Sequence, residues 1–328
     1  MLLVGDIGGT NTRLALFSKD ATKVEHQDVL PSAEHPSLSS AIDAFLGPKK
    51  KRPHLSGATF GIAGPVIRGR VRATNLPWVV DERVLARQLG LKHVTLINDL
   101  VALALGAVAA KRKDLHVLLG TKPPRGSGGN IVVIAAGTGL GEAALVWDGK
   151  RLVPCGGEGG HSEFAPRSDL EWELRAFIAE RIGGRVSCER VLSGPGIGTI
   201  YDFFRQKRGV KEAAAIAHQI EDAKDRNAMI GELGTAKKSD ACVQTLALFA
   251  GIYGAEAGNL ALKFLATGGV FLAGKIASAM VPILGHRFAP AFVDKGRMST
   301  LLQQIPVAIV KSSSIGLHGS ARHAAGLT

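Results

Sequence analysis

The chain opens with a hydrophobic segment that glycines interrupt: residues 3–17 read LVGDIGGTNTRLALF. Two short apolar runs on either side of a Gly-rich turn predict a β-hairpin. Residues 131–147, IVVIAAGTGLGEAALVW, repeat this order of apolar strand, glycine turn and apolar strand. Thr10 and Thr138 occupy comparable places in the two turns. The repeat predicts two domains that each begin with the same strand–turn–strand unit.

The glycines of the first turn do not match the common nucleotide motifs. Their spacing at positions 5, 8 and 9 fails the G-x-G-x-x-G pattern, a strand follows them instead of a helix, and no P-loop lysine is present. The backbone N–H groups of such a turn can still form an anion site, to which Thr10 and Thr138 would add hydroxyl donors. Two matched turns favour a triphosphate held from opposite sides, whereas one turn alone is equally an ordinary tight hairpin.

An aspartate inside the first turn needs its own explanation. A carboxylate beside a polyphosphate repels it, unless the carboxylate holds Mg²⁺ directly or through water. Asp6 is therefore a candidate magnesium residue. The alternative is that its side chain only accepts hydrogen bonds from the amides of the turn.

A second group of polar residues has the composition of a sugar site. Asn98 and Asp99 lie where a buried strand ends and an Ala/Leu-rich helix begins, and ligands of open α/β sheets bind at such edges. Glu158 and His161 lie among the glycines of GGEGGHSEF, and Glu189 precedes an expected Gly-Pro turn. Carboxylates and amides can hydrogen-bond adjacent hydroxyls, and one carboxylate must take the proton of an attacking hydroxyl.

Each of these residues also has a structural explanation. Asp99 could simply cap the helix that follows it, and His161 could be a satisfied loop histidine. Glu158 and His161 have the chemistry of metal ligands, but the sequence offers no clustered Cys or His to complete such a site. The set, more than any single member, favours polyol binding.

Composition limits the class of protein. The chain has 328 residues, 46% of them hydrophobic, and a formal net charge of +12, which suits polyanionic partners without choosing among nucleic acid, acidic membranes and nucleotides. The basic residues form short scattered groups typical of solvated loops. Three widely spaced cysteines give no disulfide framework, and no signal peptide or bilayer-spanning run is apparent. We therefore expect a cytoplasmic protein with no nucleic-acid or membrane partner.

Seven motifs, in order along the chain, carry a family resemblance: LVGDIGGTNTRLAL, INDLVALALG, GTGLGEA, GEGGHSEFAPR, ERVLSGPGI, GGVFLAG and GLHGSARH. Together they resemble the bacterial glucokinase family, within the sugar kinase, actin and heat-shock ATPase superfamily. The likeness runs from residue 3 to about residue 323. It implies an α/β, two-domain actin-like ATPase (ribonuclease H-like) fold with an interdomain cleft that closes on the sugar. The small domain would span 1–110 and be completed by a helix at 312–328, capped by Ser314, with 111–311 as the large domain.

The resemblance also implies an activity, Mg²⁺-ATP-dependent phosphorylation of the 6-hydroxyl of glucose, and commonly a homodimer. Asp99 would be the general base. The sugar would be held by Asn98, Asp99, Glu158, His161 and Glu189. ATP would be held by Gly5, Asp6, Ile7, Gly8, Gly9, Thr10, Asn11, Gly137, Thr138, Gly139, Gly268 and Gly269, the last two against the adenosine and Asp6 near Mg²⁺ through water or ATP.

Four features depart from the family pattern. Lys275 stands where a glycine is usual, on the expected adenosine side, so the nucleotide preference stays open. Glu142 stands where an apolar residue is common, and Leu100 where a phenylalanine is common. The prolyl-arginine that tends to follow Lys275 in the family is also missing. The absence of the zinc-binding cysteine cluster of repressor-type relatives favours the zinc-free branch.

Several alternatives to a glucose kinase remain at this stage. They are a kinase for another hexose such as mannose or fructose, a sugar-sensing regulator without turnover, an actin- or chaperone-like ATPase, and polyphosphate or ADP as the phosphoryl donor.

Overall fold

The computed structural model describes residues 1–74, 76–125, 128–312 and 314–327. The chain forms two compact units. Unit 1 comprises Met1–Asp114, Ala143–Gly157 and Ser312–Thr328, and unit 2 comprises Leu115–Glu142 and Glu158–Lys311. The first division therefore follows Asp114 instead of residue 110, and residues 143–157, which the sequence assigned to the large domain, belong to unit 1.

Unit 1 contains β1 (Leu2–Ile7), β2 (Asn11–Phe17), β3 (Val24–Pro31), α1 (Leu38–Leu46), β4 (Gly57–Ile62), β5 (Arg70–Arg72), β6 (Val79–Asp81), α2 (Glu82–Leu89), β7 (Thr95–Asn98), α3 (Asp99–Val108), β11 (Leu152–Gly157) and α13 (Ile315–Ala324). Its main sheet has the order β3-β2-β1-β4-β7. β1 pairs antiparallel with β2 in the expected hairpin, and parallel with β4, which pairs parallel with β7.

The alternation of side chains along β1 builds a core on each face of this sheet. Leu3 and Ile7 belong to a cluster that includes Leu38 of α1, whereas Leu2 and Val4 pack with Leu317 of α13. Successive residues of a strand point to opposite faces, so an uninterrupted apolar run is buried on both sides.

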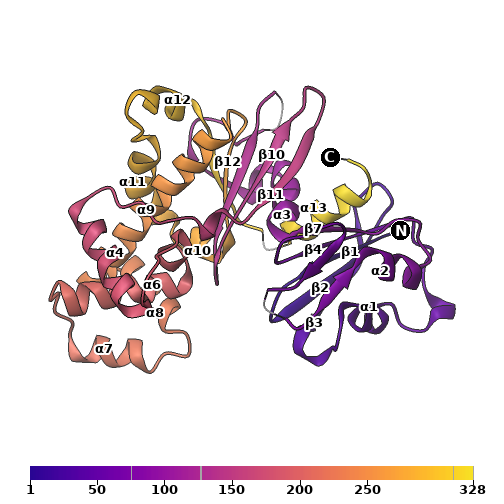
Figure 1. Cartoon of the computed structure of the whole chain (residues 1–328), viewed down its shortest axis with the longest axis horizontal. Helices are drawn as coiled ribbons and strands as arrows, with labels where there is room; N and C mark the ends of the chain where they lie inside the picture. The colour runs from indigo at the N-terminus through magenta and orange to yellow at the C-terminus, as the bar shows by residue number, and fades with distance from the viewer. Residues whose placement is uncertain (75, 126–127, 313, 328) are drawn as a thin grey trace. The chain divides into compact units, whose positions relative to one another are not determined.

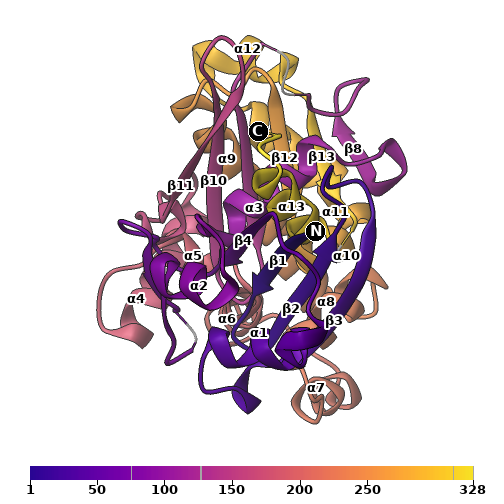
Figure 2. The same cartoon turned by 90° about the vertical axis from the view of Figure 1, so that its right-hand side faces the viewer.

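The C-terminal helix α13 lies beside α3, β1 and β4 in the views of Figure 1 and Figure 2. Close approach is possible because Gly319 faces the backbone of α3: a Cβ at this position would lie 1.7 Å from the carbonyl oxygen of Ala102. The expected N-cap residue of this helix is in position, but its side chain does not cap the helix. Ser314 occupies the N-cap position, but its φ of −94° and ψ of 3° are not extended, and its side chain makes no capping hydrogen bond.

Unit 2 contains β8 (Leu115–Leu119), β9 (Ile131–Ala136), α4 (Asp169–Ile182), α5 (Cys188–Val191), α6 (Gly194–Asp202), α7 (Ala214–Glu221), α8 (Arg226–Thr235), α9 (Asp240–Lys263), β12 (Gly269–Ala273), α10 (Gly274–Ala279), α11 (Val281–Val293), α12 (Ser299–Gln304) and β13 (Val307–Val310). β10 (Leu140–Trp147) begins in unit 2 and continues into unit 1. The second sheet has the strand order β11-β10-β9-β12-β13-β8.

The long helix α9 forms the centre of the helical part of unit 2. It packs against α11, and the ring of Tyr253 meets that of Phe288 edge to face at 5.7 Å. The Tyr253 hydroxyl donates a hydrogen bond of 3.1 Å to the carbonyl of Ile134 in β9. These contacts hold α9 against the sheet. Within the described residues, no helix is long and apolar enough to cross a membrane.

We predict that Gly319→Ala lowers the stability of unit 1 by about 2 kcal/mol or more, because the added methyl group collides with the backbone of α3. Gly316→Ala on the same helix is the matched control. Its Cβ would lie 3.9 Å from the nearest heavy atom, so the substitution should be neutral or slightly stabilising. Urea unfolding monitored by circular dichroism tests this, and equal midpoints for the two variants would contradict it.

Candidate active site

Polar residues of unit 1 gather where three parallel strands end. Ile7 of β1 is in register with Ile62 of β4, which is in register with Asn98 of β7. The glycine turn after β1 and the Asn98-Asp99 pair therefore lie along one edge of the sheet, about 10 Å apart across the intervening strand. This is the edge at which ligands of α/β sheets bind.

Asn98 and Asp99 are oriented by the start of α3. Asn98 is the N-cap, its Oδ1 accepting from the Leu100 N–H at 2.9 Å, and its amide donates to the carbonyl of Gly64 at 3.4 Å. Asp99 opens the helix and its Oδ1 also accepts from the Leu100 N–H at 2.9 Å. Both residues are half-buried. The Asp99 residue lies at the junction of β7 and α3, as the sequence predicts.

The first glycine turn is shorter than the motif suggests. Gly5 and Ile7 lie inside β1, where a Cβ on Gly5 would meet Phe60 at 2.7 Å and Ile7 belongs to the core. The turn itself is formed by Gly8, Gly9 and Thr10, and Asn11 begins β2; the Gly8 N–H donates to the Asn11 carbonyl at 3.0 Å.

Sequence reasoning missed the residue that supports this turn, Ser32. Its hydroxyl donates to the Gly8 carbonyl at 2.9 Å, and its N–H donates to the Thr10 carbonyl at 2.9 Å. Ser32 is fully buried and follows β3, so only strand pairing brings it to the turn.

Asp6 is paired with Arg13, whose Nη1 lies 3.2 Å from Oδ2. Burial raises the pKa of Asp6, and Arg13 only partly opposes this rise. A carboxylate that is incompletely compensated would gain from a nearby cation, so Asp6 fits an indirect role in holding Mg²⁺. The described part of the chain has no cluster of three or more Cys, His, Asp or Glu that could hold a metal, so phosphate oxygens and water would supply the other ligands.

The predicted sugar residues of unit 2 converge. Nε2 of His161 lies 3.9 Å from Oε2 of Glu158, and Nδ1 lies 4.0 Å from Oε1 of Glu189. The side chains of His161 and Glu158 are 58% and 50% exposed. The imidazole thus stands between two accessible carboxylates from two chain segments, an array of donors and acceptors that suits adjacent hydroxyl groups.

Glu189 also contacts the second glycine turn. Its Oε2 accepts from the Leu140 N–H at 3.0 Å, directly after the turn Gly137–Gly139. The Gly137 N–H donates to the Gly139 carbonyl at 2.8 Å, and the Gly137 carbonyl accepts from Gly194 at 2.8 Å. The expected Gly-Pro turn after Glu189 is instead the start of α6, with Ser193 as its N-cap. One end of α6 therefore abuts the turn.

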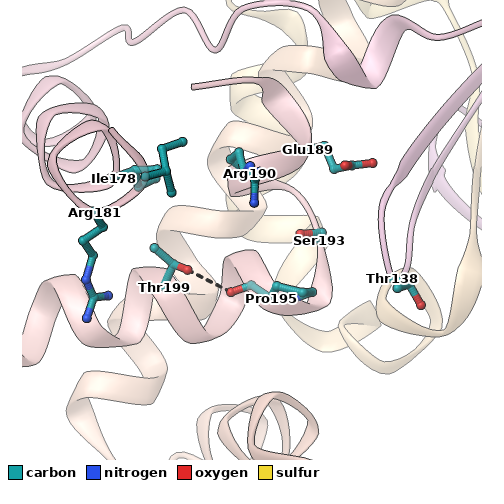
Figure 3. A pocket seen from close by; sticks show the side chains of 9 residues that line it. Thr138, Ile178, Arg181, Glu189, Arg190, Ser193, Pro195 and Thr199 are labelled. Carbon is teal, nitrogen blue, oxygen red and sulfur yellow. Dashed lines mark hydrogen bonds between the residues drawn. The ribbon is translucent and has the colours of Figure 1, made fainter. Parts of the chain in front are cut away.

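A cavity of about 330 Å³ opens beside this turn. Figure 3 shows the residues that line it: Ile178 and Arg181 of α4, Glu189 and Arg190 of α5, Ser193 at the N-cap of α6, Pro195 and Thr199 within α6, and Thr138 of the turn. Ile182 of α4 also lines the cavity. Arg190 is exposed, whereas Arg181 is ion-paired with Asp202, its Nη1 lying 3.2 Å from Oδ2. The cavity combines an apolar side with two guanidinium groups, as a nucleotide requires.

The structure does not bring Gly268 and Gly269 to the cavity beside the turn Gly137–Gly139. β12 runs parallel to β9 and pairs Gly269 with Ile131, so both glycines lie at the end of the strand about 20 Å from the turn. They allow close packing, since a Cβ on Gly268 would meet the Gly129 carbonyl at 2.7 Å and one on Gly269 would meet Pro124 at 2.4 Å. Gly274 at the other end of β12 lies against the Ala136 carbonyl, just before the turn.

Comparison with known proteins identifies the family. The glucokinase family model matches residues 3–327. The chain belongs to the glucokinase family. A glucokinase of Nostoc punctiforme is 39% identical over 342 aligned residues, covering 100% of this chain and 99% of the relative. The solved glucokinase of an Antarctic psychrotroph is 31% identical, with a TM-score of 0.82 and coverage of 99% and 98%.

A ROK family glucokinase from Streptomyces griseus, solved with glucose and AMPPNP, has the same fold with 19% identity, a TM-score of 0.65 and 98% coverage of both chains. These findings confirm the family resemblance and the α/β two-domain actin-like fold class. They also confirm that family members such as this chain are enzymes that phosphorylate glucose with ATP.

Glu142, one departure from the family pattern, is a buried acid of β10. The residue is 4% exposed, and the nearby Glu256 of α9 is 7% exposed. Burial and the charge of Glu256 raise the pKa of Glu142 from 4.5 to about 7, although Lys263 opposes the shift. The folded protein therefore holds a proton on Glu142 that the unfolded chain releases at lower pH.

We predict that Glu142→Gln removes a pH dependence of stability. Because the pKa of Glu142 is raised on folding, its proton stabilises the native state below pH 4.5, and this contribution is lost as pH rises to about 7. The loss is on the order of 3 kcal/mol, so the variant should exceed the wild type by up to that amount at pH 8 and match it near pH 4. Urea unfolding at both pH values measures this; a pH-independent difference would argue against a buried proton.

Proposed function

We propose that this chain transfers the γ-phosphoryl group of ATP to the 6-hydroxyl of glucose, with Asp99 as the general base. The observation that carries the proposal is the convergence of Glu158, His161 and Glu189 beside the turn Gly137–Gly139 within one unit. A polyol site and a phosphate turn that share one carboxylate belong to a kinase of sugars. The S. griseus relative, which holds glucose and AMPPNP in one structure, supports this pairing of ligands.

The sugar is proposed to be held by hydrogen bonds from five residues: Asn98, Asp99, Glu158, His161 and Glu189. The carboxylates accept from sugar hydroxyls, whereas the amide of Asn98 and the imidazole of His161 can also donate. Asp99 accepts the proton of the 6-hydroxyl as that oxygen attacks phosphorus, the role that an aspartate has in other phosphoryl transfers.

The donor is proposed to be ATP, bound by the turns Gly8–Thr10 and Gly137–Gly139. Their backbone N–H groups stabilise phosphate oxygens, and the hydroxyls of Thr10 and Thr138 add donors. We place the nucleoside toward the cavity beside Thr138 and toward Gly274 and Lys275, in preference to Gly268 and Gly269, because only the former lie near the turn.

Asp6 is proposed to act on Mg²⁺ through water or ATP. When bound, Mg²⁺ neutralises charge on the phosphates during transfer. Arg13 holds the Asp6 carboxylate in place until then.

We also propose that the enzyme works in the cytoplasm as a homodimer. All three cysteines are free thiols, two of them buried, which suits a reducing compartment. Sedimentation velocity of the purified protein tests the dimer.

The experiment that tests the function is ADP release from Mg²⁺-ATP by the purified protein, with glucose, mannose, fructose, N-acetylglucosamine or no sugar. We expect release that depends on glucose. Release without any sugar would instead indicate an ATPase of the same fold. Binding of glucose without release from ATP, polyphosphate or ADP as donor would indicate a sensor.

We predict that Asp99→Asn lowers kcat by about 10²–10⁴-fold and leaves the glucose Kd within about threefold, because asparagine cannot accept the proton. The amide oxygen can still accept from the Leu100 N–H, so the start of α3 is kept. Asp81→Asn, at the N-cap of α2, is the matched control and should retain activity. Steady-state kinetics and glucose calorimetry measure both constants, and a kcat within tenfold of wild type would remove Asp99 as the base.

A further inference from the structure

Two buried carboxyl groups of unit 2 have no assigned role. Glu142 lies on β10 and Glu256 on α9, and one oxygen of each is buried without a hydrogen-bond partner among the described residues. The Glu256 carboxylate has other partners: Oε2 accepts from the Asn259 amide at 3.0 Å, and Oε1 lies 3.7 Å from Nζ of Lys263. Glu142 makes no ion pair in the described part of the chain. Because an unpaired buried charge is costly, Glu142 is the member of the pair that stays neutral.

The Glu142 carboxyl group lies directly against the loop that carries the sugar residues. A Cβ built on Gly159 would lie 2.0 Å from Oε2 of Glu142, and one on Gly160 would lie 2.0 Å from the Leu140 carbonyl oxygen. The backbone between Glu158 and His161 therefore rests on β10. The loop is closed on itself by hydrogen bonds from the His161 N–H to Glu158, at 3.0 Å, and from the Ser162 N–H to Gly159, at 2.8 Å.

The other side of this loop is held by α5. The Cys188 N–H donates to the Ser162 carbonyl at 2.9 Å, and the Cys188 thiol donates to the Glu163 carbonyl at 3.4 Å. Burial raises the pKa of this thiol to about 12, and Glu256 and Glu142 add to the rise, so the thiol and both carboxyl groups share one buried region. The loop is thus fixed between β10 and α5, next to Glu189.

The charged and titratable groups that face Glu142 come from α9 and α5. They are Glu256 and Lys263, the Tyr253 phenol, and the Cys188 thiol. Only Lys263 is positively charged, and it is already shared with Glu256. An ionised Glu142 would therefore be repelled by Glu256 and would have to move or admit water, and either change displaces Gly159.

We propose that the neutral Glu142 carboxyl group is a positioning residue for glucose binding, because it supports the Gly159–Gly160 backbone that presents Glu158 and His161. Loss of its proton loosens the loop and weakens glucose binding without acting on the phosphoryl transfer itself. The inference rests on the proposed assignment of Glu158 and His161 to the sugar. It makes glucose affinity depend on pH, because an ionised Glu142 would have to leave its contact with the Gly159 backbone.

The test compares KM for glucose and kcat between pH 6 and pH 8.5 in the wild type, Glu142→Gln and Glu142→Met. In the wild type we expect KM for glucose to rise about fivefold between pH 6 and pH 8.5, with a smaller change in kcat. A fivefold change is at the lower end of the coupling usually found between two sites of a protein. Both variants lack the titrating group, so their KM should stay near the low-pH value. Glu256→Gln should move the rise to lower pH, because removal of a like charge lowers the pKa of Glu142.

Calorimetry in buffers of different ionisation enthalpy supplies a readout that a purely structural role would not change. If glucose binds better to the protonated form, binding near pH 7.5 takes up a fraction of a proton in the wild type and none through this group in Glu142→Gln. A KM profile for Glu142→Gln that matches the wild type would overturn the inference. Restoration of glucose affinity at pH 8.5 by added K⁺ would also overturn the inference, because a cation instead of a proton would then occupy the Glu142–Glu256 pair.

The two proposals fail in different ways. Absence of both glucose binding and glucose-dependent ADP release contradicts the proposed function. Glucose binding with no difference in proton uptake between the wild type and Glu142→Gln contradicts only the role of Glu142.

Discussion

The contacts of the Glu189 carboxylate organise the candidate sugar residues of unit 2. One of its oxygens accepts from the Leu140 N–H at 3.0 Å, and the other lies 4.0 Å from His161. The same group therefore contacts both the end of the Gly137–Gly139 turn and the His161 imidazole, two parts of the proposed phosphate and sugar sites. Gly139 makes this possible, since a Cβ there would lie 2.3 Å from Oε2. In the proposed function, one shared residue would set the donor and acceptor positions and so reduce the orientation entropy that the transfer must overcome.

The candidate residues of unit 1 are organised by strand order. β1, β4 and β7 run parallel and end in register, so the chain turns at Gly8 and at Asp99 on the same edge. The sequence predicted this edge well, because each motif joins an apolar run to a turn or helix start that local chemistry specifies. It could not predict Ser32, whose hydrogen bonds to Gly8 and Thr10 depend on the pairing of β2 with β3.

The glycines show where sequence reasoning stops. Glycines stand at both ends of β12, Gly268 and Gly269 at one end and Gly274 at the other, and a motif does not say at which end of a strand the ligand binds. The parallel pairing of β12 with β9 puts Gly269 beside Ile131 and Gly274 beside Ala136, and this decides which one is near the turn. Ser314 is a similar case: its residue type suits a helix cap, but the backbone enters α13 in a conformation that leaves the hydroxyl elsewhere.

The sequence by itself determined the family and the two glycine turns and supplied the candidate site residues, because these depend on short segments whose hydrogen bonding and periodicity are local. Only the tertiary structure decided which residues support them. The sequence shows that Glu142 stands where an apolar residue is common but does not connect it with the distant Glu256; the packing of α9 near β10 buries both carboxyl groups in one region. A raised pKa arises from burial and from a neighbouring charge, and both are properties of the folded chain that no segment carries alone.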